Sequence, residues 1–330
     1  MERFALAAAV VLGFALTAAL CSLFVPLRRV LERREQQQPV QSERPRPAPL
    51  RAPLWGGLCA AAGTVAAVGV GWLAACVGQP ELLGSEGRLM TRLLTALAGS
   101  LAFGAVGLAE DLARMRSPAA LGLRRDVRLL LEALAAAFVL LLLRAAGCLP
   151  RGLGVPGAGY VLLGSAVPFL WAVLMVALAE CARIAERDEG TVCGAAFVAM
   201  LALMMVEAGL GVSGLAVLPA ALAGALVALG LWAFPPARLG AGCCGSLLAA
   251  GAIGCIPLSL DMTSLTVPLA LPFWAAGGLW AAQLLCAKHT GKPLRCWVKK
   301  HKMSPETVFL CSFALSAVGY VLALALLRWC

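Results

Sequence analysis

Two adjacent carboxylates, Glu110 and Asp111, close an eighteen-residue apolar run at 92–109. Five arginines follow within the next connection, at positions 114, 116, 124, 125 and 128. Carboxylates beside cations at a membrane surface are the groups that a phosphoryl-transfer site uses, because a divalent metal and a polyphosphate both need neutralising. The same residues also suit the polar end of an ordinary membrane helix, and composition leaves both interpretations open.

A second polar segment runs over 180–190, where positions 180, 183, 186 or 187, and 190 fall on one helical face. This face could hold a metal or a nucleotide. It could equally be a ladder of Glu–Arg pairs that closes a helix at Gly190.

Two further segments are candidates for binding charged or lipidic groups. The glycine-rich turn at 235–246 opens an apolar run, where backbone amides could bind a phosphate or small residues could serve close helix packing. The basic stretch at 288–302 is typical of a segment anchored at anionic lipid headgroups.

The elements that must position these residues are membrane helices. The chain has 330 residues, is 61% hydrophobic and 13% charged, and has a mean hydropathy of +0.89. A soluble domain needs about twice that charge, and the continuous apolar runs lack the alternation of barrel strands. We therefore predict a single polytopic all-α membrane domain over 1–330, with about ten spans near 4–25, 53–77, 92–109, 127–145, 159–179, 191–206, 214–233, 243–260, 266–286 and 307–327.

The distribution of basic residues predicts the orientation. Of the 27 Lys and Arg, 21 lie in or beside the connections after the first, third, fifth, seventh and ninth spans. The positive-inside rule puts these five loops in the cytoplasm, where they form the site, and both termini outside. The net charge of +10 is then a topology signal, and nucleic acid is not an expected partner.

The cysteines and histidines limit which kinds of metal or disulfide site the chain can form. The 13 cysteines are scattered and form no CxxC pair, so we expect mostly small buried hydrophobic residues rather than a disulfide framework. With only His289 and His301 available, a histidine metal cluster is excluded. The proline-rich stretch at 26–52 is expected to be a solvated linker.

The order of these segments resembles the polyprenyl-phosphate N-acetylhexosamine-1-phosphate transferases, most closely the phospho-N-acetylmuramoyl-pentapeptide translocase branch. The segment 107–114 (GLAEDLAR) resembles the family's GFLDDYLK, with Glu110 and Asp111 at the paired aspartates and Arg114 at the lysine. The segment 122–132 (GLRRDVRLLLE) resembles GLSARQKLLLQ, with Arg128 at its lysine.

Five more segments are similar to family motifs, and some of them differ in chemistry. Residues 180–190 lie where the family has NAVNLTDGLDG, so that Glu186 and Glu189 replace aspartates and Arg183 replaces an asparagine. Residues 236–246 resemble PAKVFMGDTGS, with Cys243 at the aspartate that holds magnesium in the family. Residues 37–40 and 51–57 resemble the glutamine stretch and GTPTMGG, and 290–292 resembles TGKR, with His301 in the shortened loop that follows.

The resemblance implies an enzyme that transfers a phospho-sugar from a UDP-sugar, UDP-MurNAc-pentapeptide or UDP-GlcNAc, to undecaprenyl phosphate, releasing UMP for peptidoglycan synthesis. It implies a multi-pass protein of the bacterial cytoplasmic membrane, in contact with membrane lipid, with Mg²⁺ as cofactor and a possible homodimer.

The resemblance also implies residue roles. Asp111 would deprotonate or orient the lipid phosphate with Glu110 beside it. The other roles are phosphate binding by Arg114, Arg128 and His301, nucleotide binding by Arg183, Glu186 and Glu189, and metal binding by Glu189 and Cys243.

Two other functions stay open. A catalytically impaired or non-catalytic relative would keep the lipid groove and bind a polyprenyl phosphate or a cell-wall partner, which Cys243 and Arg183 favour because a thiol is a soft ligand and Mg²⁺ prefers oxygen. A transporter fits less well, since no span carries a charge at its midpoint and no two halves look alike.

Overall fold

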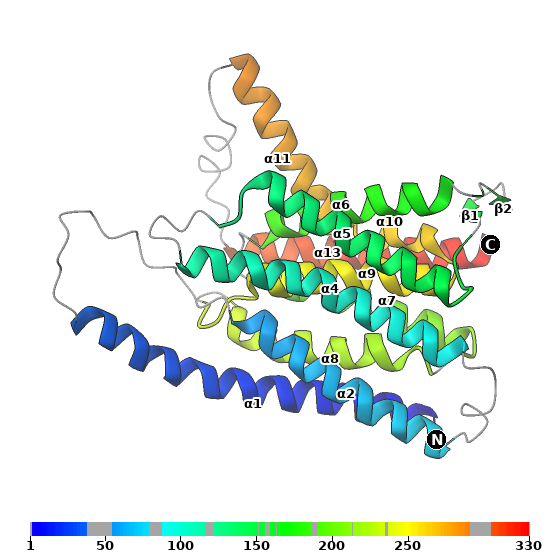
Figure 1. The fold of residues 1–330 in the computed structure, drawn as a ribbon, viewed down its shortest axis with the longest axis horizontal. Helices are drawn as coiled ribbons and strands as arrows, with labels where there is room; N and C mark the ends of the chain where they lie inside the picture. Colours follow the sequence, from blue (N-terminus) through cyan, green and yellow to red (C-terminus); the bar gives the residue numbers. More distant parts are fainter. Residues whose placement is uncertain are drawn as a thin grey trace.

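The chain folds as a bundle of long helices in a computed structural model (Figure 1). The structure describes residues 2–37, 55–78, 88–116, 122–150, 152–155, 159–162, 164, 166–186, 190–212, 214–234, 237–290 and 305–329. Its long helices are α1 (Glu2–Gln37), α2 (Gly56–Gly78), α4 (Arg88–Arg116), α5 (Arg125–Ala145), α6 (Ala166–Ala185), α7 (Thr191–Gly209), α8 (Val217–Ala233), α9 (Gly242–Ser259), α11 (Leu271–Thr290) and α13 (Pro305–Trp329).

Short elements connect some of these helices. The strands β1 (Gly152–Val155) and β2 (Gly159–Leu162) pair antiparallel as a small hairpin between α5 and α6. A 3-10 turn, η1 (Thr263–Leu265), and the four-residue α10 (Thr266–Leu269) lie between α9 and α11. Apart from the hairpin, the regular structure of the described residues is helical, as the sequence predicts.

Each of the ten predicted spans overlaps a helix, and seven of the described helices are long and apolar enough to cross a membrane. The bent pair α10–α11 raises this number to eight if it is one span. Helix α8 is apolar but has only 17 residues. Helix α5 carries the charged residues Arg128, Glu132 and Arg144 along its length, so it is not among the seven apolar helices. The protein is thus a multi-pass membrane protein.

Two of the predicted spans differ from the observed helices. The fifth was expected from 159, but 159–162 forms β2 and α6 begins only at Ala166. The ninth, 266–286, is not one straight helix, because the chain bends by 63° between α10 and α11. Pro268 and Pro272 flank this bend, and a proline inside a helix removes a backbone hydrogen bond and clashes with the preceding turn.

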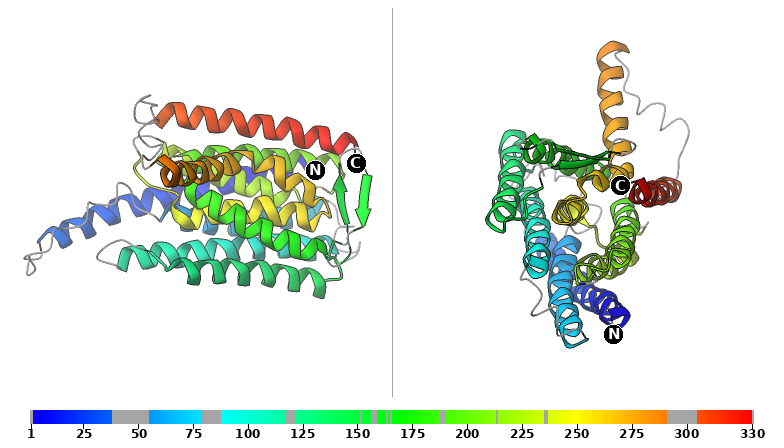
Figure 2. Two further views of the ribbon diagram at one scale, coloured as in Figure 1. Left: turned by 90° about the horizontal axis from the view of Figure 1, so that it is seen from above. Right: turned by 90° about the vertical axis from the view of Figure 1, so that its right-hand side faces the viewer.

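Helix α9 forms the centre of the bundle. All of its span is buried, and the end-on view in Figure 2 shows the other helices around it. Its small residues allow backbones to approach closely, as in other membrane bundles. A Cβ on Gly107 of α4 would collide with the backbone at Cys243 and Cys244, and one on Gly57 of α2 would collide with the backbone of Gly245.

The ends of α4 and α6 and the starts of α5 and α9, which carry the described polar residues, lie at one end of the bundle, at the left of Figure 1. The start of α2 is tied to the turn before α9 by a hydrogen bond from the Gly56 amide to the Gly240 carbonyl, at 3.2 Å. Helix α1 continues to Gln37, so the first part of the predicted linker at 26–52 is helical. The rest of that linker lies outside the described residues.

Candidate functional site

The carboxylate of Asp111 is fixed at the N-terminus of α9. It is 1% exposed and accepts hydrogen bonds from the backbone amides of Cys243 and Cys244, at 3.0 and 2.9 Å. A carboxylate at this place also meets the positive end of the helix dipole. The sequence left open whether the glycine-rich turn binds a phosphate or serves close helix packing; among the described residues its amides donate to the Asp111 side chain, and its small residues pack closely against α2 and α4.

The neighbouring carboxylate of Glu110 lies between two guanidinium groups. Its Oε1 is 2.8 Å from a nitrogen of Arg114 and 3.6 Å from one of Arg128. Arg114 also approaches Asp111, with a nitrogen 3.9 Å from its Oδ1. The second oxygen of Glu110, Oε2, is buried and has no hydrogen-bond partner. Within the part of the chain that the structure describes, it is therefore an unused acceptor.

Arg128 joins three helices. From α5 it binds Glu180 of α6 with two nitrogens, at 2.7 and 3.3 Å, while it also faces Glu110 of α4. The Oε1 of Glu132, one turn along α5, lies 4.0 Å from the Nε of Arg128, and neither of its carboxylate oxygens has a hydrogen-bond partner in the described ranges. Because the guanidinium is planar and always charged, one arginine can hold several carboxylates in fixed positions.

Arg183 adds a third cation. It donates to Glu180 at 2.7 Å, one helical turn away, so one pair of the Glu–Arg ladder that the sequence offered is present along α6. Its Nε is buried and has no partner among the described residues, so it is a donor that could meet an acceptor from a ligand. One interpretation of the sequence had this ladder end a helix at Gly190, and the structure differs from it. Helix α6 ends at Ala185, and Gly190 precedes α7 with a positive φ of 77°.

Glu186 follows α6 directly and belongs to the same cluster. Burial raises the pKa of its carboxyl to about 7; the Arg114 guanidinium opposes this rise, and the carboxylates of Asp111 and Glu110 add to it. At neutral pH this group is therefore close to its midpoint, so it can bind or release a proton there.

The structure thus brings together most of the predicted site residues. Those it assembles at one end of the bundle are Glu110, Asp111, Arg114, Arg128, Arg183, Glu186 and Cys243. Glu189 and His301 lie outside the described residues. Sequence reasoning gave no role to Glu132 or to Glu180 as partners of Arg128; the four-residue spacing from Arg128 to Glu132 was the available signal.

The described donors do not fit a magnesium ion well. Both oxygens of Asp111 accept backbone amides, one oxygen of Glu110 faces two guanidiniums, and Cys243 offers a fully buried soft sulfur. Within the described ranges, no three His, Cys, Asp or Glu side chains are arranged to hold a metal. Magnesium needs about six oxygen ligands near ideal octahedral geometry, so these groups alone do not make such a site.

Comparison with known families gives one match. The sequence model of glycosyl transferase family 4 matches residues 93–261, just over half of the chain. The chain belongs to glycosyl transferase family 4. The matched part runs from α4 to the end of α9 and contains every residue of the cluster described above. No curated protein matches the chain.

Membership of glycosyl transferase family 4 confirms the coarser prediction. The match supports the polyprenyl-phosphate hexosamine-1-phosphate transferases as the wider group, without singling out the phospho-N-acetylmuramoyl-pentapeptide branch. Family 4 is a family of sugar-phosphate transferases, whose substrates are in general a polyprenyl phosphate and a nucleotide sugar.

Proposed function

We propose that this protein transfers a phospho-sugar from a UDP-sugar to undecaprenyl phosphate. An oxygen of the lipid phosphate forms a bond to the β-phosphorus of the UDP-sugar. The bond from that phosphorus to the oxygen bridging the two phosphates breaks, and UMP leaves. The product is a lipid-linked pyrophosphoryl sugar, an intermediate of the kind that peptidoglycan synthesis uses.

The observation that supports this proposal is the convergence of three arginines and several buried carboxylates from α4, α5 and α6 at one end of a membrane bundle. One substrate is soluble and highly charged, whereas the other is lipidic. A charged cluster at the end of apolar helices is where both can be reached at once. The positive-inside rule assigns this end to the cytoplasm, where nucleotide sugars are made.

The unpartnered atoms indicate which groups meet substrate. The free Nε of Arg183 donates to a phosphate oxygen, and Arg114 and Arg128 neutralise the charge that develops on the pyrophosphate. The free Oε2 of Glu110 accepts a hydrogen bond or a proton from the lipid phosphate. The resemblance gives Asp111 the task of deprotonating or orienting the lipid phosphate; because both of its oxygens accept amides of α9, we propose instead that Asp111 holds the start of α9 against α4 and orients Glu110 beside it.

The remaining assignments also belong to the proposal. Glu186, together with Glu189, binds the nucleotide, and His301 binds phosphate. Magnesium is expected from the resemblance, with Glu189 and the Cys243 position as its protein contacts, but no step is assigned to it because the described donors fit it poorly. The resemblance favours MurNAc-pentapeptide over GlcNAc as the sugar of the donor, the proposed setting is the bacterial cytoplasmic membrane, and a homodimer is a possible assembly.

The experiment is a UMP-release assay on purified protein in detergent. Undecaprenyl phosphate is supplied with UDP-MurNAc-pentapeptide or UDP-GlcNAc, with and without Mg²⁺. We expect UMP release that requires both substrates, is fastest with the pentapeptide donor and falls at least a hundredfold in Arg183→Met. Release without the lipid, or no release with either donor, contradicts the proposal.

A second candidate is a non-catalytic relative that binds polyprenyl phosphate. The occupation of both Asp111 oxygens by α9 and the buried thiol of Cys243 favour it, because these positions then serve packing rather than chemistry. Binding of undecaprenyl phosphate without any UMP release identifies this candidate.

A further inference from the structure

A groove of about 590 Å³, the α5–α6 groove, opens between the second half of α5 and the start of α6. Its volume lies in the range of sites that bind small organic ligands. The residues that line it come from α5, from the connection after α5 and from Pro168 in the first turn of α6. All of them are apolar except Arg144 of α5, so the groove combines an apolar surface with one positive charge.

Arg144 ends an exposed apolar stripe along α5. Leu130, Leu134 and Leu141 are 60%, 56% and 65% exposed, and Ala137 is exposed between them. These residues recur every three or four positions, so they share one helical face, and in a membrane bundle such a face contacts hydrocarbon. Arg144 follows Leu141 by three residues and is exposed on the same face. The lipid-facing surface thus changes from apolar to cationic at the end of the helix.

The length of α5 puts Arg144 at the level of the lipid headgroups. Helix α5 has 21 residues, and at about 1.5 Å per residue it is about 31 Å long, which matches a hydrocarbon core of about 30 Å. The helix begins at Arg125, at the end of the bundle that the positive-inside rule assigns to the cytoplasm. Arg144 therefore reaches the boundary of the outer leaflet, and the apolar part of the groove borders the first carbons of the acyl chains.

Arg144 also lacks an acidic partner among the described residues. Arg114, Arg124 and Arg128 each have a carboxylate oxygen nearby, at 2.8, 3.8 and 2.7 Å. No carboxylate of the described ranges forms such a pair with Arg144. A guanidinium binds phosphate oxygens well because its planar array of donors matches their geometry. Arg144 is thus available to a phosphate that comes from outside the protein.

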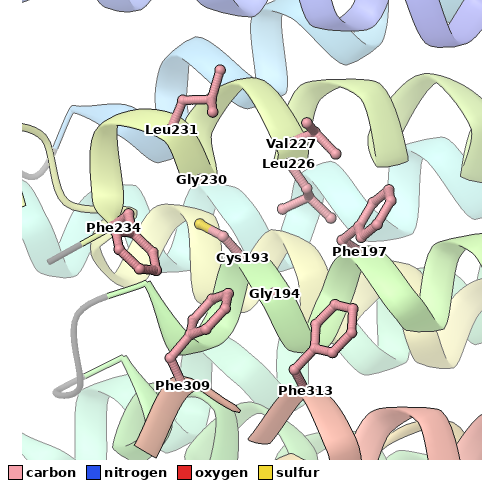
Figure 3. Close-up of a pocket in the computed structure, with 10 residues that line it drawn as sticks. All are labelled: Cys193, Gly194, Phe197, Leu226, Val227, Gly230, Leu231, Phe234, Phe309 and Phe313. Carbon is pink, nitrogen blue, oxygen red and sulfur yellow. The ribbon is translucent and has the colours of Figure 1, made fainter. Parts of the chain in front are cut away.

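A second groove, of about 350 Å³ between α7, α8 and α13, has a different lining. Figure 3 shows four phenylalanine side chains there, Phe197, Phe234, Phe309 and Phe313, together with aliphatic residues, two glycines and Cys193. None of the described residues that line it carries a charge. This second groove has no group that would distinguish an anionic lipid from a neutral one, so it serves as an internal comparison.

We propose that the α5–α6 groove binds an anionic phospholipid of the outer leaflet, with the lipid phosphate at Arg144 and the upper part of an acyl chain against the apolar lining. Charge complementarity selects this occupant. A phospholipid such as phosphatidylglycerol presents a phosphate whose charge is not compensated, whereas the phosphate of phosphatidylcholine has a cation within the same headgroup. A lipid bound here contacts both α5 and α6 and stabilises the folded protein. The site lies at the opposite end of α5 from the charged cluster, and its occupation does not depend on the proposed reaction.

The first test measures stabilisation by lipids of different charge. Purified full-length protein in detergent micelles is supplied with phosphatidylglycerol or phosphatidylcholine, and its melting temperature is followed by tryptophan fluorescence. We expect phosphatidylglycerol to raise the melting temperature of the wild type by about 4 °C more than phosphatidylcholine does. Arg144→Gln should lose this difference. The matched control Arg124→Gln removes an exposed arginine at the other end of the bundle and should keep it.

Three results of this test overturn the proposal. They are equal stabilisation of the wild type by the two lipids, an undiminished difference in Arg144→Gln, and an equal loss in both variants. Glycerol phosphate, which carries the anionic group without acyl chains, should not stabilise the wild type. If it stabilises as much as phosphatidylglycerol does, the ligand is a free phosphate and the lipid assignment is wrong.

A second test locates the lipid directly. Phosphatidylglycerol with a diazirine on the first carbons of its acyl chains is cross-linked to the protein in nanodiscs, and the labelled peptides are identified by mass spectrometry. We expect labels at the end of α5 and the start of α6. Ala137→Trp fills the groove and should abolish these labels, whereas Ala133→Trp, at an exposed position one turn earlier that does not line the groove, should leave them.

The second groove gives the comparison within the same experiment. Labels between α7, α8 and α13 should be equally strong with phosphatidylglycerol and phosphatidylcholine probes, while those at the α5–α6 groove should require the anionic probe. Labels at the α5–α6 groove that ignore the headgroup or survive Ala137→Trp overturn the proposal. Cross-links that join two copies of the chain at this groove would show that a second protein occupies it, and they also overturn the proposal.

Discussion

Asp111→Asn tests whether the second carboxylate is a structural anchor as well as a site residue. The side chain accepts one backbone amide on each oxygen, at 3.0 and 2.9 Å. Asparagine has the same shape but keeps one acceptor oxygen, so its amide group faces one of the two N–H groups and leaves it unpaired. The substitution also removes the charge that the N-terminus of α9 stabilises.

The expected loss follows from these contacts. Losing one charge-assisted hydrogen bond and leaving a buried donor unpaired costs about 1.5–3 kcal/mol of unfolding free energy. The substitution also removes the repulsion between the adjacent Glu110 and Asp111 carboxylates, which reduces the loss of unfolding free energy. We expect a decrease in the melting temperature of about 3–6 °C, measured by tryptophan fluorescence during thermal unfolding in detergent.

Glu110→Gln is the matched control. Only Oε1 of Glu110 is engaged, so a glutamine can keep its carbonyl oxygen toward Arg114 and place its amide where Oε2 has no partner. We expect a smaller decrease in melting temperature than for Asp111→Asn, but a larger loss of UMP release per folded molecule. Equal destabilisation by the two variants, or an unchanged melting temperature in Asp111→Asn, refutes the anchoring role.

Three further perturbations test other parts of the cluster. Because the folded-state pKa of Glu186 is raised to about 7, the wild type should lose stability as pH rises from about 4.5 to 7. Glu186→Gln should flatten this part of the profile of melting temperature against pH. A variant profile that runs parallel to that of the wild type contradicts the raised pKa. Cys243→Asp adds an oxygen ligand beside buried carboxylates, so it should lower the melting temperature in EDTA. Mg²⁺ should then raise the melting temperature of the variant by several degrees, clearly more than that of the wild type; equal responses of the two proteins count against a metal contact at this position. Arg128→Met and Glu180→Gln should each destabilise the protein by about 2–4 kcal/mol, and the double variant by clearly less than their sum, as a thermal double-mutant cycle measures; additivity contradicts the buried pair.

Much of the fold was predictable because membrane helices can be recognised as long apolar runs in the sequence. Ten apolar runs predicted ten helices, since every backbone group in hydrocarbon must be paired within its own segment. The hairpin at 152–162 and the bend near Ala270 were missed because both interrupt otherwise apolar sequence. Pro268 and Pro272 were visible signals for the bend, but proline is tolerated in membrane helices often enough to leave such a signal ambiguous.

The site was predictable as a set of segments and not as a set of contacts. Charged residues near a membrane are costly, so Glu110, Asp111, Arg114 and Arg128 stood out in the sequence. That α9 presents its first amides to Asp111 could not be predicted, because it depends on how closely Gly107 lets α4 approach α9. Local spacing likewise cannot show that Arg128 reaches Glu180, which is 52 residues away.

The most direct test of the central claim is UMP release in a single turnover, with the protein in excess over UDP-MurNAc-pentapeptide and undecaprenyl phosphate present. The account predicts UMP formation that requires the lipid. This UMP formation is lost in Arg183→Met, while that variant still melts cooperatively. Undecaprenyl phosphate bound by the wild type without any UMP formed would contradict it.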